Sequence, residues 1–465
     1  MQDHSVLRRR ELDNVTNHSS QPTAEQHPGE APVILTPGRE RYALCVLMLI
    51  YAFGYLDRQV VNILAEPIKN ELHLSDSALG LLTGLAFALF YTLLGLPVAR
   101  LADRFDRSRI ISISLFVWSS CTALSGLASS YVSLLLLRIG VGIGEAGCNP
   151  PATSLIADVV PRHRRASAMS IFALGNPIGS LLGLAVGGII AATLGWRAAF
   201  LIAGLPGIAL ALLAWLTLPE PRRDRKQAED VPTIGEAFRE FGGKPTFWLL
   251  GLGAAMMAFV HYGNIAFYSS FFLRNHADGL ASSVVWAHDA TGIDLPPLAL
   301  LGIALGLMMG VFGALGIVAG GKIADRVGAR NPAAYMTAPF VAAAAQVPFC
   351  IMGLFVENVW LALGLFCVPA FLTTIWFGPV MAVAAGLVGP RVRSTSGAML
   401  QLIINLIGLG LGPLSIGILS DLIAGTGGDS GQSLRFALAA SSATGLLAAL
   451  CFFRARAYIA RDMIS

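Results

Sequence analysis

Apolar residues form twelve long, nearly unbroken segments after residue 41, and polar residues gather in the short stretches between them. Each segment holds about 20 residues or more, the length at which a helix crosses the hydrocarbon core of a bilayer. The pattern therefore predicts an all-α membrane protein with twelve transmembrane helices. Their approximate limits are 42–66, 77–100, 107–128, 131–158, 166–192, 196–218, 246–274, 297–321, 333–355, 358–388, 396–423 and 434–455.

Composition agrees with this interpretation, and the distribution of charge orients the chain. Only 13% of the 465 residues are charged, whereas a soluble domain has about 25%. With a cytoplasmic N-terminus, eighteen Lys and Arg residues fall in the loops on that side and four in the opposite loops. Positively charged loops stay in the cytoplasm, so we expect a multi-pass protein of the cell inner (plasma) membrane with both termini cytoplasmic. The four opposite residues are Lys69, Arg197, Arg274 and Arg435.

Polar and proline-rich stretches divide the chain further. The N-terminal residues are polar and interrupted by prolines, which is typical of disorder. A charged linker separates two groups of six segments, and its Phe238 and Phe241 have helical spacing, so part of it is expected to lie as a helix on the membrane surface. The predicted parts are a disordered cytoplasmic tail (1–40), a six-helix half (41–218), a cytoplasmic linker (219–245), a second six-helix half (246–458) and a cytoplasmic C-terminal tail (459–465).

The two halves repeat one another. Ala102-Asp103-Arg104 follows the second segment, and Ala324-Asp325-Arg326 follows the eighth. We therefore expect two pseudo-symmetric halves, with a site between them near the middle of the membrane, as in many transporters.

Four of the sixty acidic and basic residues fall deep inside apolar segments, namely Asp57, Arg58, Arg138 and Glu145. An ionisable group at the bilayer centre costs several kcal/mol and usually has a function. We assign proton coupling to Asp57 and Glu145, and we expect Arg58 and Arg138 to hold those acids or an anionic headgroup. Both Asp57–Arg138 and Arg58–Glu145 pairs are feasible across the two helices.

The second half has no such charges. Aligning the halves places Gly263 and Asn264 where the first half has Asp57 and Arg58, and Cys367 and Thr374 where it has Arg138 and Glu145. We expect uncharged walls there, with the apolar part of a substrate directed toward the seventh and tenth segments. The residues expected to line the cavity are Tyr51, Tyr55, Asn62, Asn149, Asn176, His261, Asn264, Tyr268 and Thr374.

Charged loop residues at the cytoplasmic side suggest a gate. A carboxylate at a helix end can cap a neighbouring helix and bind an arginine across the gap. We expect such a latch, made only when the inner side is closed, from Arg100, Asp103, Arg104, Asp325 and Arg326. In the fifth segment Gly175, Gly179, Gly183 and Gly187 recur every four residues, which predicts a close approach between helices.

These motifs resemble the major facilitator superfamily. The similar segments are Leu101 to Phe105 with its copy Gly321 to Gly328, Arg138 to Gly147, Gly195 to Arg197, and Leu218 to Glu220. Tyr55 to Gln59, taken with the Arg138 to Glu145 run, looks most like the spinster group. The resemblance implies the major facilitator fold and a lipid-like substrate, because eukaryotic members of that group are similar to exporters of sphingosine-1-phosphate or lysophospholipids.

Some positions depart from these patterns. Ala99 and Asp106 stand where the loop signature usually has glycines. The fifth segment reads Gly175-Asn176-Pro177 and lacks the Gly-Pro pattern associated with drug antiporters, which puts an antiport or multidrug function in doubt.

The sequence as a whole predicts a secondary active transporter that moves a small amphipathic or anionic solute by alternating access, coupled to protons. We expect no cofactor beyond the proton gradient, the lipid bilayer and a small solute as partners, no nucleic acid, no enzymatic activity and a monomer. Two alternatives remain, an organic anion or sugar-acid symporter and a non-transporting lipid receptor or scaffold. The receptor would tolerate loss of the buried charges, and flux in proteoliposomes separates the two classes.

Overall fold

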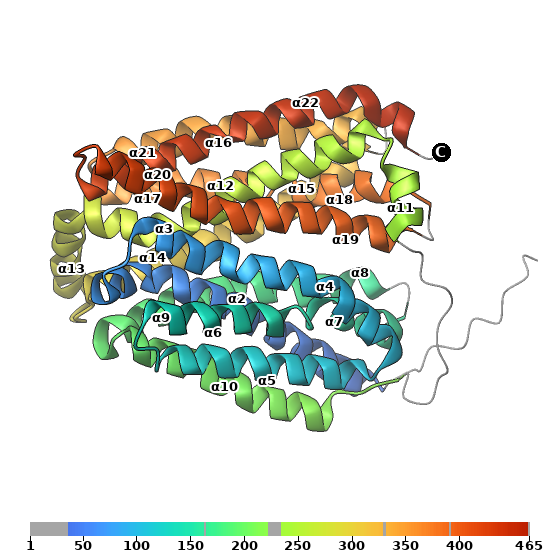
Figure 1. The fold of residues 1–465 in the computed structure, drawn as a ribbon, viewed down its shortest axis with the longest axis horizontal. Helices are drawn as coiled ribbons and strands as arrows, with labels where there is room; N and C mark the ends of the chain where they lie inside the picture. The colour runs from blue at the N-terminus through green and yellow to red at the C-terminus, as the bar shows by residue number, and fades with distance from the viewer. Residues whose placement is uncertain (1–35, 162–163, 222–233, 329–331, 390–391, 464–465) are drawn as a thin grey trace, which may run out of the picture.

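The computed structural model describes residues 36–161, 164–221, 234–328, 332–389 and 392–463 as an assembly of long helices. Figure 1 shows two groups of roughly parallel helices, the first running from α2 to α10 and the second from α12 to α22. The predicted tail at residues 1–35 lies outside the described residues, as does most of the charged part of the linker.

The first group contains six membrane-spanning units. They are α2 (Pro37–Leu72); α3, η1 and α4 (Asp76–Gly80, Leu81–Leu85, Ala86–Arg104); α5 (Arg107–Ser125); α6 and α7 (Tyr131–Glu145, Asn149–Val159); α8 and α9 (Arg165–Ala173, Gly175–Leu194); and α10 (Trp196–Thr217).

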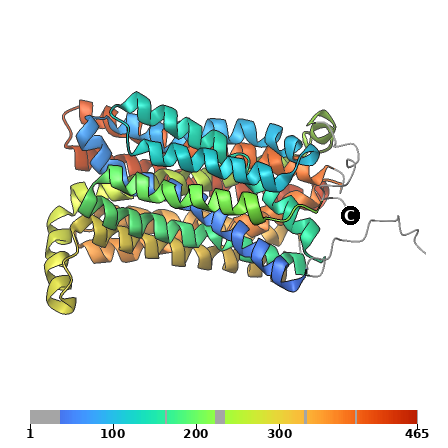
Figure 2. The same ribbon diagram turned by 90° about the horizontal axis from the view of Figure 1, so that it is seen from below.

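The second group follows the linker helix α11 (Ile234–Phe241) and repeats this plan. Its units are α12 (Pro245–Asn275); α14, η3 and α15 (Pro297–Leu307, Met308–Phe312, Gly313–Gly328); η4 and α16 (Pro332–Met336, Thr337–Phe355); α17 and α18 (Val359–Leu372, Phe377–Gly386); α19, η5 and α20 (Arg393–Ile404, Asn405–Leu411, Gly412–Gly425); and α21 and α22 (Ser430–Ala443, Gly445–Asp462). The additional helix α13 (Ala277–Thr291) projects sideways from one end of the assembly (Figure 2).

The twelve predicted spans all correspond to helical units. Eleven helices of the described chain are long and apolar enough to cross a membrane by length and composition. The twelfth unit, α5, falls below that level because serines and Arg107 and Arg109 lower its hydropathy. Several helices continue beyond the predicted limits, and α22 reaches Asp462, which accepts hydrogen bonds from the backbone and side chain of Thr246. The last helix therefore extends into the segment that the sequence predicted as a tail.

Glycines bring helices together within the first half. Four glycines of α9 face α2, and a Cβ atom added at Gly175 or Gly183 would lie only 2.7 or 2.6 Å from a backbone oxygen of α2. Such distances leave no space for a side chain, so the prediction of a close glycine-lined approach is confirmed. The helix spacing depends on the absence of side chains on this face.

The two halves approach each other most closely toward one end. We call the end that carries Asp76, Arg274 and Asp421 the distal end, and the end that carries Pro37 and Asp462 the terminal end (Figure 1). A Cβ atom on Gly306 of α14 would lie 2.9 Å from the Leu181 oxygen of α9, and one on Gly84 of η1 would lie 2.9 Å from the Gly410 oxygen of η5. Backbone thus packs on backbone between the halves at two crossings.

The linker helix α11 packs against the second half. Phe241 is fully buried and stacks on Phe247 at the start of α12, with 4.1 Å between ring centroids. Phe238 is half exposed. The helical spacing of the two aromatic residues was thus a correct indication of a helix, although one ring belongs to the protein core and only the other is free to meet a membrane surface.

The packing of α9 on α2 predicts a large effect of Gly183→Leu. The added side chain must displace Leu56 and Gln59 of α2, and overpacking of this kind costs about 1–3 kcal/mol. Gly364→Leu on α17 is the matched control, because a Cβ atom there meets nothing within 4 Å. We expect detergent-purified Gly183→Leu to unfold at a lower temperature than wild type and Gly364→Leu to match it. Equal unfolding temperatures for the two variants would contradict this packing argument.

Candidate functional site: a buried charge cluster and two helix ends

The first half holds an ion pair between two of its helices. Arg58 of α2 donates from Nε and one terminal nitrogen to Glu145 Oε2 of α6, at 2.9 and 2.6 Å. The side chains of Arg58 and Glu145 are 14% and 4% exposed. Of the two cross-helix pairs considered from the sequence, the Arg58–Glu145 pair is the one that forms.

Aromatic rings enclose the Arg58 guanidinium. Its central carbon lies 4.6 Å from the ring centroid of Phe87, 4.7 Å from that of Tyr91 and 5.2 Å from that of Tyr55. Aromatic faces attract a cation, and more strongly when water is excluded. The rings therefore help to hold a positive charge in an otherwise apolar helix bundle.

The other two charged residues lack an ionic partner. Asp57 is 1% exposed and accepts a hydrogen bond from Thr122 at 2.9 Å, while its second oxygen has no partner in the described chain. Arg138 is 2% exposed and lies over the Phe87 ring at 5.4 Å. Among the described residues it forms no ion pair or hydrogen bond, so the feasible Asp57–Arg138 pair is absent from this structure.

Two cavities adjoin these charges. One lies within the first half and is lined by Tyr51, Tyr55, Arg58, Glu145 and Asn149 among others. The other lies between the halves. Its polar lining includes Arg58, Asn62 and Arg138, and its apolar lining from the second half is Ile265, Ala266, Leu409 and Pro413.

A third, small cavity lies within the second half and is lined by His261, Asn264, Tyr268 and Thr373 among others. His261 Nδ1 lies 3.2 Å from the Thr373 hydroxyl. From the sequence we expected uncharged walls in the second half, with His261, Asn264 and Tyr268 among the lining residues, and these three residues lie around this cavity.

Two of the predicted lining residues lie elsewhere. Thr374 donates to the backbone oxygens of Gly313 and Phe371 and lines none of the three cavities. Its neighbour Thr373 lines the third cavity, because one residue rotates a helical side chain by about 100°. Asn176 accepts a hydrogen bond from Ser180 of its own helix and also lies outside these cavities.

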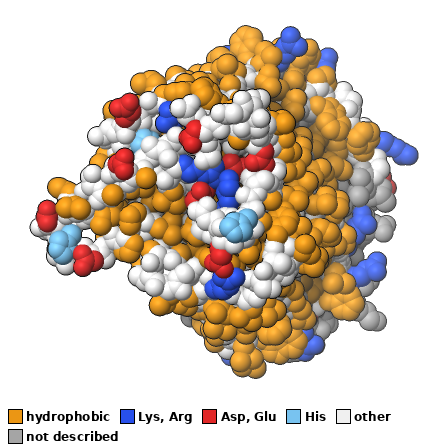
Figure 3. Space-filling model, turned by 60° about the vertical axis from the view of Figure 1, so that its left-hand side comes forward, with side chains coloured by type: hydrophobic (Ala, Val, Ile, Leu, Met, Phe, Trp, Pro, Cys, Tyr) orange, Lys and Arg blue, Asp and Glu red, His pale blue; other side chains and the backbone are white. Residues whose placement is uncertain are grey.

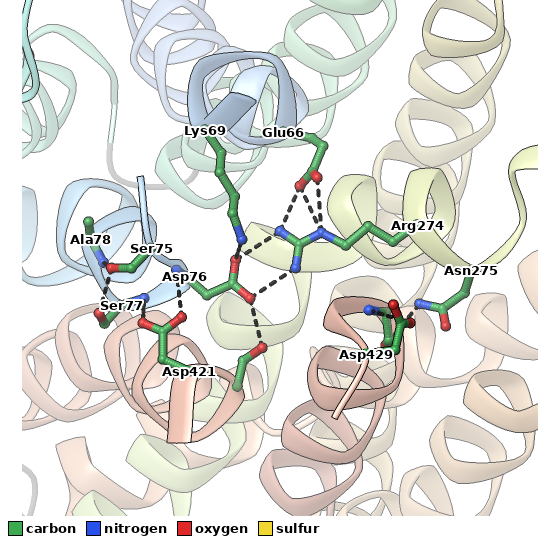
Figure 4. A network of polar contacts seen from close by, with 12 residues as sticks. Glu66, Lys69, Ser75, Asp76, Ser77, Ala78, Arg274, Asn275, Asp421 and Asp429 are labelled. Atoms are coloured by element: carbon green, nitrogen blue, oxygen red, sulfur yellow. Dashed lines mark hydrogen bonds and ion pairs between the residues drawn. The ribbon is translucent and has the colours of Figure 1, made fainter. Parts of the chain in front are cut away.

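Ion pairs join the two halves at the distal end (Figure 4). Arg274 of the second half lies between Glu66 and Asp76 of the first half, at 2.7 and 2.8 Å. Lys69 also contacts Asp76, at 2.5 Å. Asp421 of the second half also accepts a hydrogen bond from the backbone N–H of Asp76, at 2.9 Å. Figure 3 shows charged side chains gathered within a largely hydrophobic surface when this end is turned toward the viewer.

Sequence reasoning missed this network. Lys69 and Arg274 were interpreted only as loop charges that set the orientation. An available signal was that both lie where cations are scarce, and that Lys69 is close in sequence to the helix-end acids Glu66 and Asp76.

The terminal end differs in its charges. Arg100, Arg104, Asp325 and Arg326 are exposed, and no ion pair among the described residues involves them. The side chain of Asp103, also predicted for the gate, lies outside the described part of the structure.

Arg107 is a loop cation that the sequence assigned only to orientation. It is 1% exposed and pairs with Glu220 at 2.7 Å and with Asp158 at 2.8 Å, all within the first half. The Leu218-Pro219-Glu220 motif was the available signal for this pair.

Comparisons with known proteins agree with the fold. The family model described as Major Facilitator Superfamily matches residues 47–413. An MFS-type efflux pump of Mycolicibacterium smegmatis is 31% identical over 436 residues, which cover 92% of this chain and 95% of the pump. Human protein spinster homolog 1 is 29% identical over 466 residues, with 92% and 83% covered.

A solved structure shows the same arrangement. It is the crystal structure of a bacterial homolog of the human lysosomal transporter Spinster, in an inward-facing and unoccupied conformation. It superposes with a TM-score of 0.81 at 33% identity, and the match covers 93% of this chain and 100% of that one.

The distal network predicts that Arg274→Gln separates the halves at that end. Removing a cation that neutralises two buried carboxylates costs about 3–5 kcal/mol of the closed arrangement. Spin labels on cysteines introduced at Ser129 and Thr426, one on each half, measure the separation. Longer distances should become populated in Arg274→Gln.

The matched control is Arg197→Gln, which removes an exposed ion pair to Glu71 within the first half. Surface pairs contribute only about 0–1 kcal/mol, so the distance distribution should stay as in wild type. Identical distributions for wild type and both variants would show that the network does not hold the distal end closed.

Proposed function

The chain belongs to the major facilitator superfamily, as a transporter of its spinster group, and we propose that it carries a small amphipathic anion by alternating access, driven by protons. The observation that carries the anionic part is the buried, unpaired Arg138. A buried cation without a partner is costly, and an anionic group of a substrate in the cavity between the halves offsets that cost. Arg58 lines the same cavity and adds a second positive charge only when its pair with Glu145 breaks.

The apolar part of the proposal rests on the shape of the same cavity. Ile265, Ala266, Leu409 and Pro413 line its second-half wall, opposite the arginines. A solute with an anionic head and an apolar tail is complementary to both walls, the head to the arginines and the tail to the apolar residues. Similarity to spinster proteins supports a lipid-like solute, while a small organic anion such as a sugar acid uses only the arginine side and is the alternative.

Proton coupling is proposed for Asp57, with Glu145 as the second acid. Asp57 has no arginine at ion-pairing distance, so a proton bound there removes an uncompensated buried charge. Ionised Asp57 leaves a negative charge that Arg138 can neutralise after a modest movement of either side chain. Proton and anion thus alternate as the groups that balance Arg138. Glu145 is held by Arg58 in this structure and becomes available only if that pair breaks.

Orientation follows from the loop charges. With the terminal end in the cytoplasm, the distal network seals the outer side. Asp325 and Arg326, exposed near the end of α15, then lie at an inner side without a latch. We propose that these residues, with Arg100, Asp103 and Arg104, join only when the inner side closes. Repeating the spin-label measurement described for Arg274→Gln with Asp325→Asn tests this latch, because the substitution should favour the distally closed state.

Asp57→Asn should abolish proton-driven transport. The amide keeps the size of the carboxyl and cannot exchange a proton, so folding and membrane insertion should be retained. Proteoliposomes with an imposed pH gradient and a fluorescent lysophosphatidate provide the assay, and we expect a loss of gradient-driven flux of at least about tenfold. Asp278→Asn on the exposed helix α13 is the control and should transport normally. Flux near the wild-type level in both Asp57→Asn and Glu145→Gln would remove proton coupling from the proposal.

Substitutions of Arg138 test the anion. Arg138→Ala should weaken binding of lysophosphatidate by about ten- to a hundredfold, which corresponds to a charge-assisted hydrogen bond of about 1.5–3 kcal/mol. Arg138→Lys should recover part of the affinity, since the charge remains but the planar fork is lost. Isothermal titration in detergent measures both. Unchanged affinity in Arg138→Ala would place the anionic group elsewhere.

A further inference from the structure

Several hydroxyl groups are buried along α5, and one of them differs from the others in what it binds. A buried hydroxyl in a helix can donate to the backbone oxygen four residues earlier. Ser112 and Ser125 do so, at 2.7 and 2.8 Å. Thr122 is 2% exposed and donates instead to Asp57 Oδ2 of α2, at 2.9 Å. Because a hydroxyl has a single hydrogen and a partner within α5 was available, burial of the hydroxyl alone does not account for this contact.

The rotation of α2 directs its two charged residues to different helices. Asp57 and Arg58 are adjacent, and one step along a helix turns the side chain by about 100°. Arg58 thereby reaches Glu145 of α6. Asp57 points to α5, where the Thr122 hydroxyl binds it. The Asp57 carboxylate is therefore held by a different helix from the one that carries Arg138.

Tight packing fixes the part of α5 that carries Thr122. A Cβ atom on Gly144 of α6 would lie 2.7 Å from the backbone nitrogen of Trp118, and one on Gly204 of α10 would lie 2.5 Å from that of Ala123. These two positions of α5 come shortly before and directly after Thr122 in the sequence. Since two neighbouring helices contact its backbone here, α5 leaves the hydroxyl little freedom to follow the carboxylate of α2.

The charged groups around Asp57 leave it one alternative partner. Those whose charge acts on it are Glu145 and Arg138 of α6 and the adjacent Arg58. Arg58 is paired with Glu145. Arg138 forms no ion pair among the described residues. The Thr122 hydroxyl and the Arg138 guanidinium are therefore the two groups that compete for ionised Asp57.

We propose that Thr122 is a positioning residue, whose hydroxyl holds ionised Asp57 on α5 and so keeps Arg138 available to the anionic group of the substrate. The inference rests on the proposed function and names the residue that decides how Arg138 is balanced. Asp57 Oδ1, which has no partner among the described residues, is left as the atom that gains and loses the proton. Without the hydroxyl, ionised Asp57 moves to Arg138 and competes with the anion, whereas protonated Asp57 does not.

A double-mutant cycle tests this role. Thr122→Val removes the hydroxyl and nearly keeps the size of the side chain. Isothermal titration of the full-length protein with lysophosphatidate in detergent measures the affinity at the most acidic and the most alkaline pH at which the protein stays folded. Each variant is compared with wild type at the same pH, so ionisation of the probe itself cancels.

At alkaline pH we expect Thr122→Val to bind the probe about tenfold more weakly than wild type, because a hydrogen bond to a charged carboxylate no longer restrains Asp57. At acidic pH, where Asp57 is protonated, the two should agree within about twofold. In the Asp57→Asn background, Thr122→Val should change the affinity by less than about twofold at either pH. Thr122→Ser, which keeps the hydroxyl, should restore the wild-type affinity at alkaline pH.

Ser125→Ala is the matched control, since it removes a buried hydroxyl of α5 that is bonded within its own helix, and it should have no effect at either pH. If Thr122→Val does not fold, Thr122→Cys, whose S–H is a weak donor, provides the same cycle. An equal loss at both pH values, a loss that persists with Asp57→Asn, or no loss at all overturns the positioning role alone. Wild type that does not bind the probe, or binds it no better than Arg138→Ala, overturns the proposed function and this inference together.

Discussion

A buried positive charge without a partner is the constraint on which the rest of this structure depends. Arg138 is enclosed by helices and an aromatic ring, and neither buried acid pairs with it. In a bundle of low dielectric constant such a charge must be balanced by an anion, by ionised Asp57 or by rearrangement. Glu145 is paired with Arg58 and therefore forms no ion pair with Arg138. Under the proposed function, an anionic group of the substrate and ionised Asp57 are the two groups that balance Arg138.

The two ends of the molecule differ in how the halves meet. Toward the distal end, glycines allow backbone to pack on backbone between the halves, and Arg274 bridges carboxylates of the first half. The backbone contacts and the ion pairs together hold the halves against each other at this end. At the terminal end Arg100, Arg104, Asp325 and Arg326 are exposed instead. Three π-helical turns, η1, η3 and η5, lie in the spans that cross between the halves, at positions where such turns permit local adjustment.

Local physical chemistry accounts for what could be predicted about the fold. Long apolar segments must form helices in a membrane, since every backbone polar group needs an internal partner, and the spans were found within a few residues of their helices. The spacing of Gly175 to Gly187 by four residues identified a helix contact, because it repeats nearly once per turn. The true ends of α2 and α22 were not predicted, since tertiary contacts such as the one between Asp462 and Thr246 extend helices beyond the apolar segments.

The sequence by itself determined the fold class, the duplication and the four residues at the charged centre, because composition and rarity within apolar segments need no knowledge of neighbours. Only the tertiary structure decided which of those charges pair. That choice depends on the rotation and spacing of α2 and α6, which set Glu145 rather than Asp57 against an arginine. The packing of distant helices likewise hid the bridge between Arg274 and Asp76. Partners almost two hundred residues apart are brought together by packing, and no local pattern in the chain records their distance.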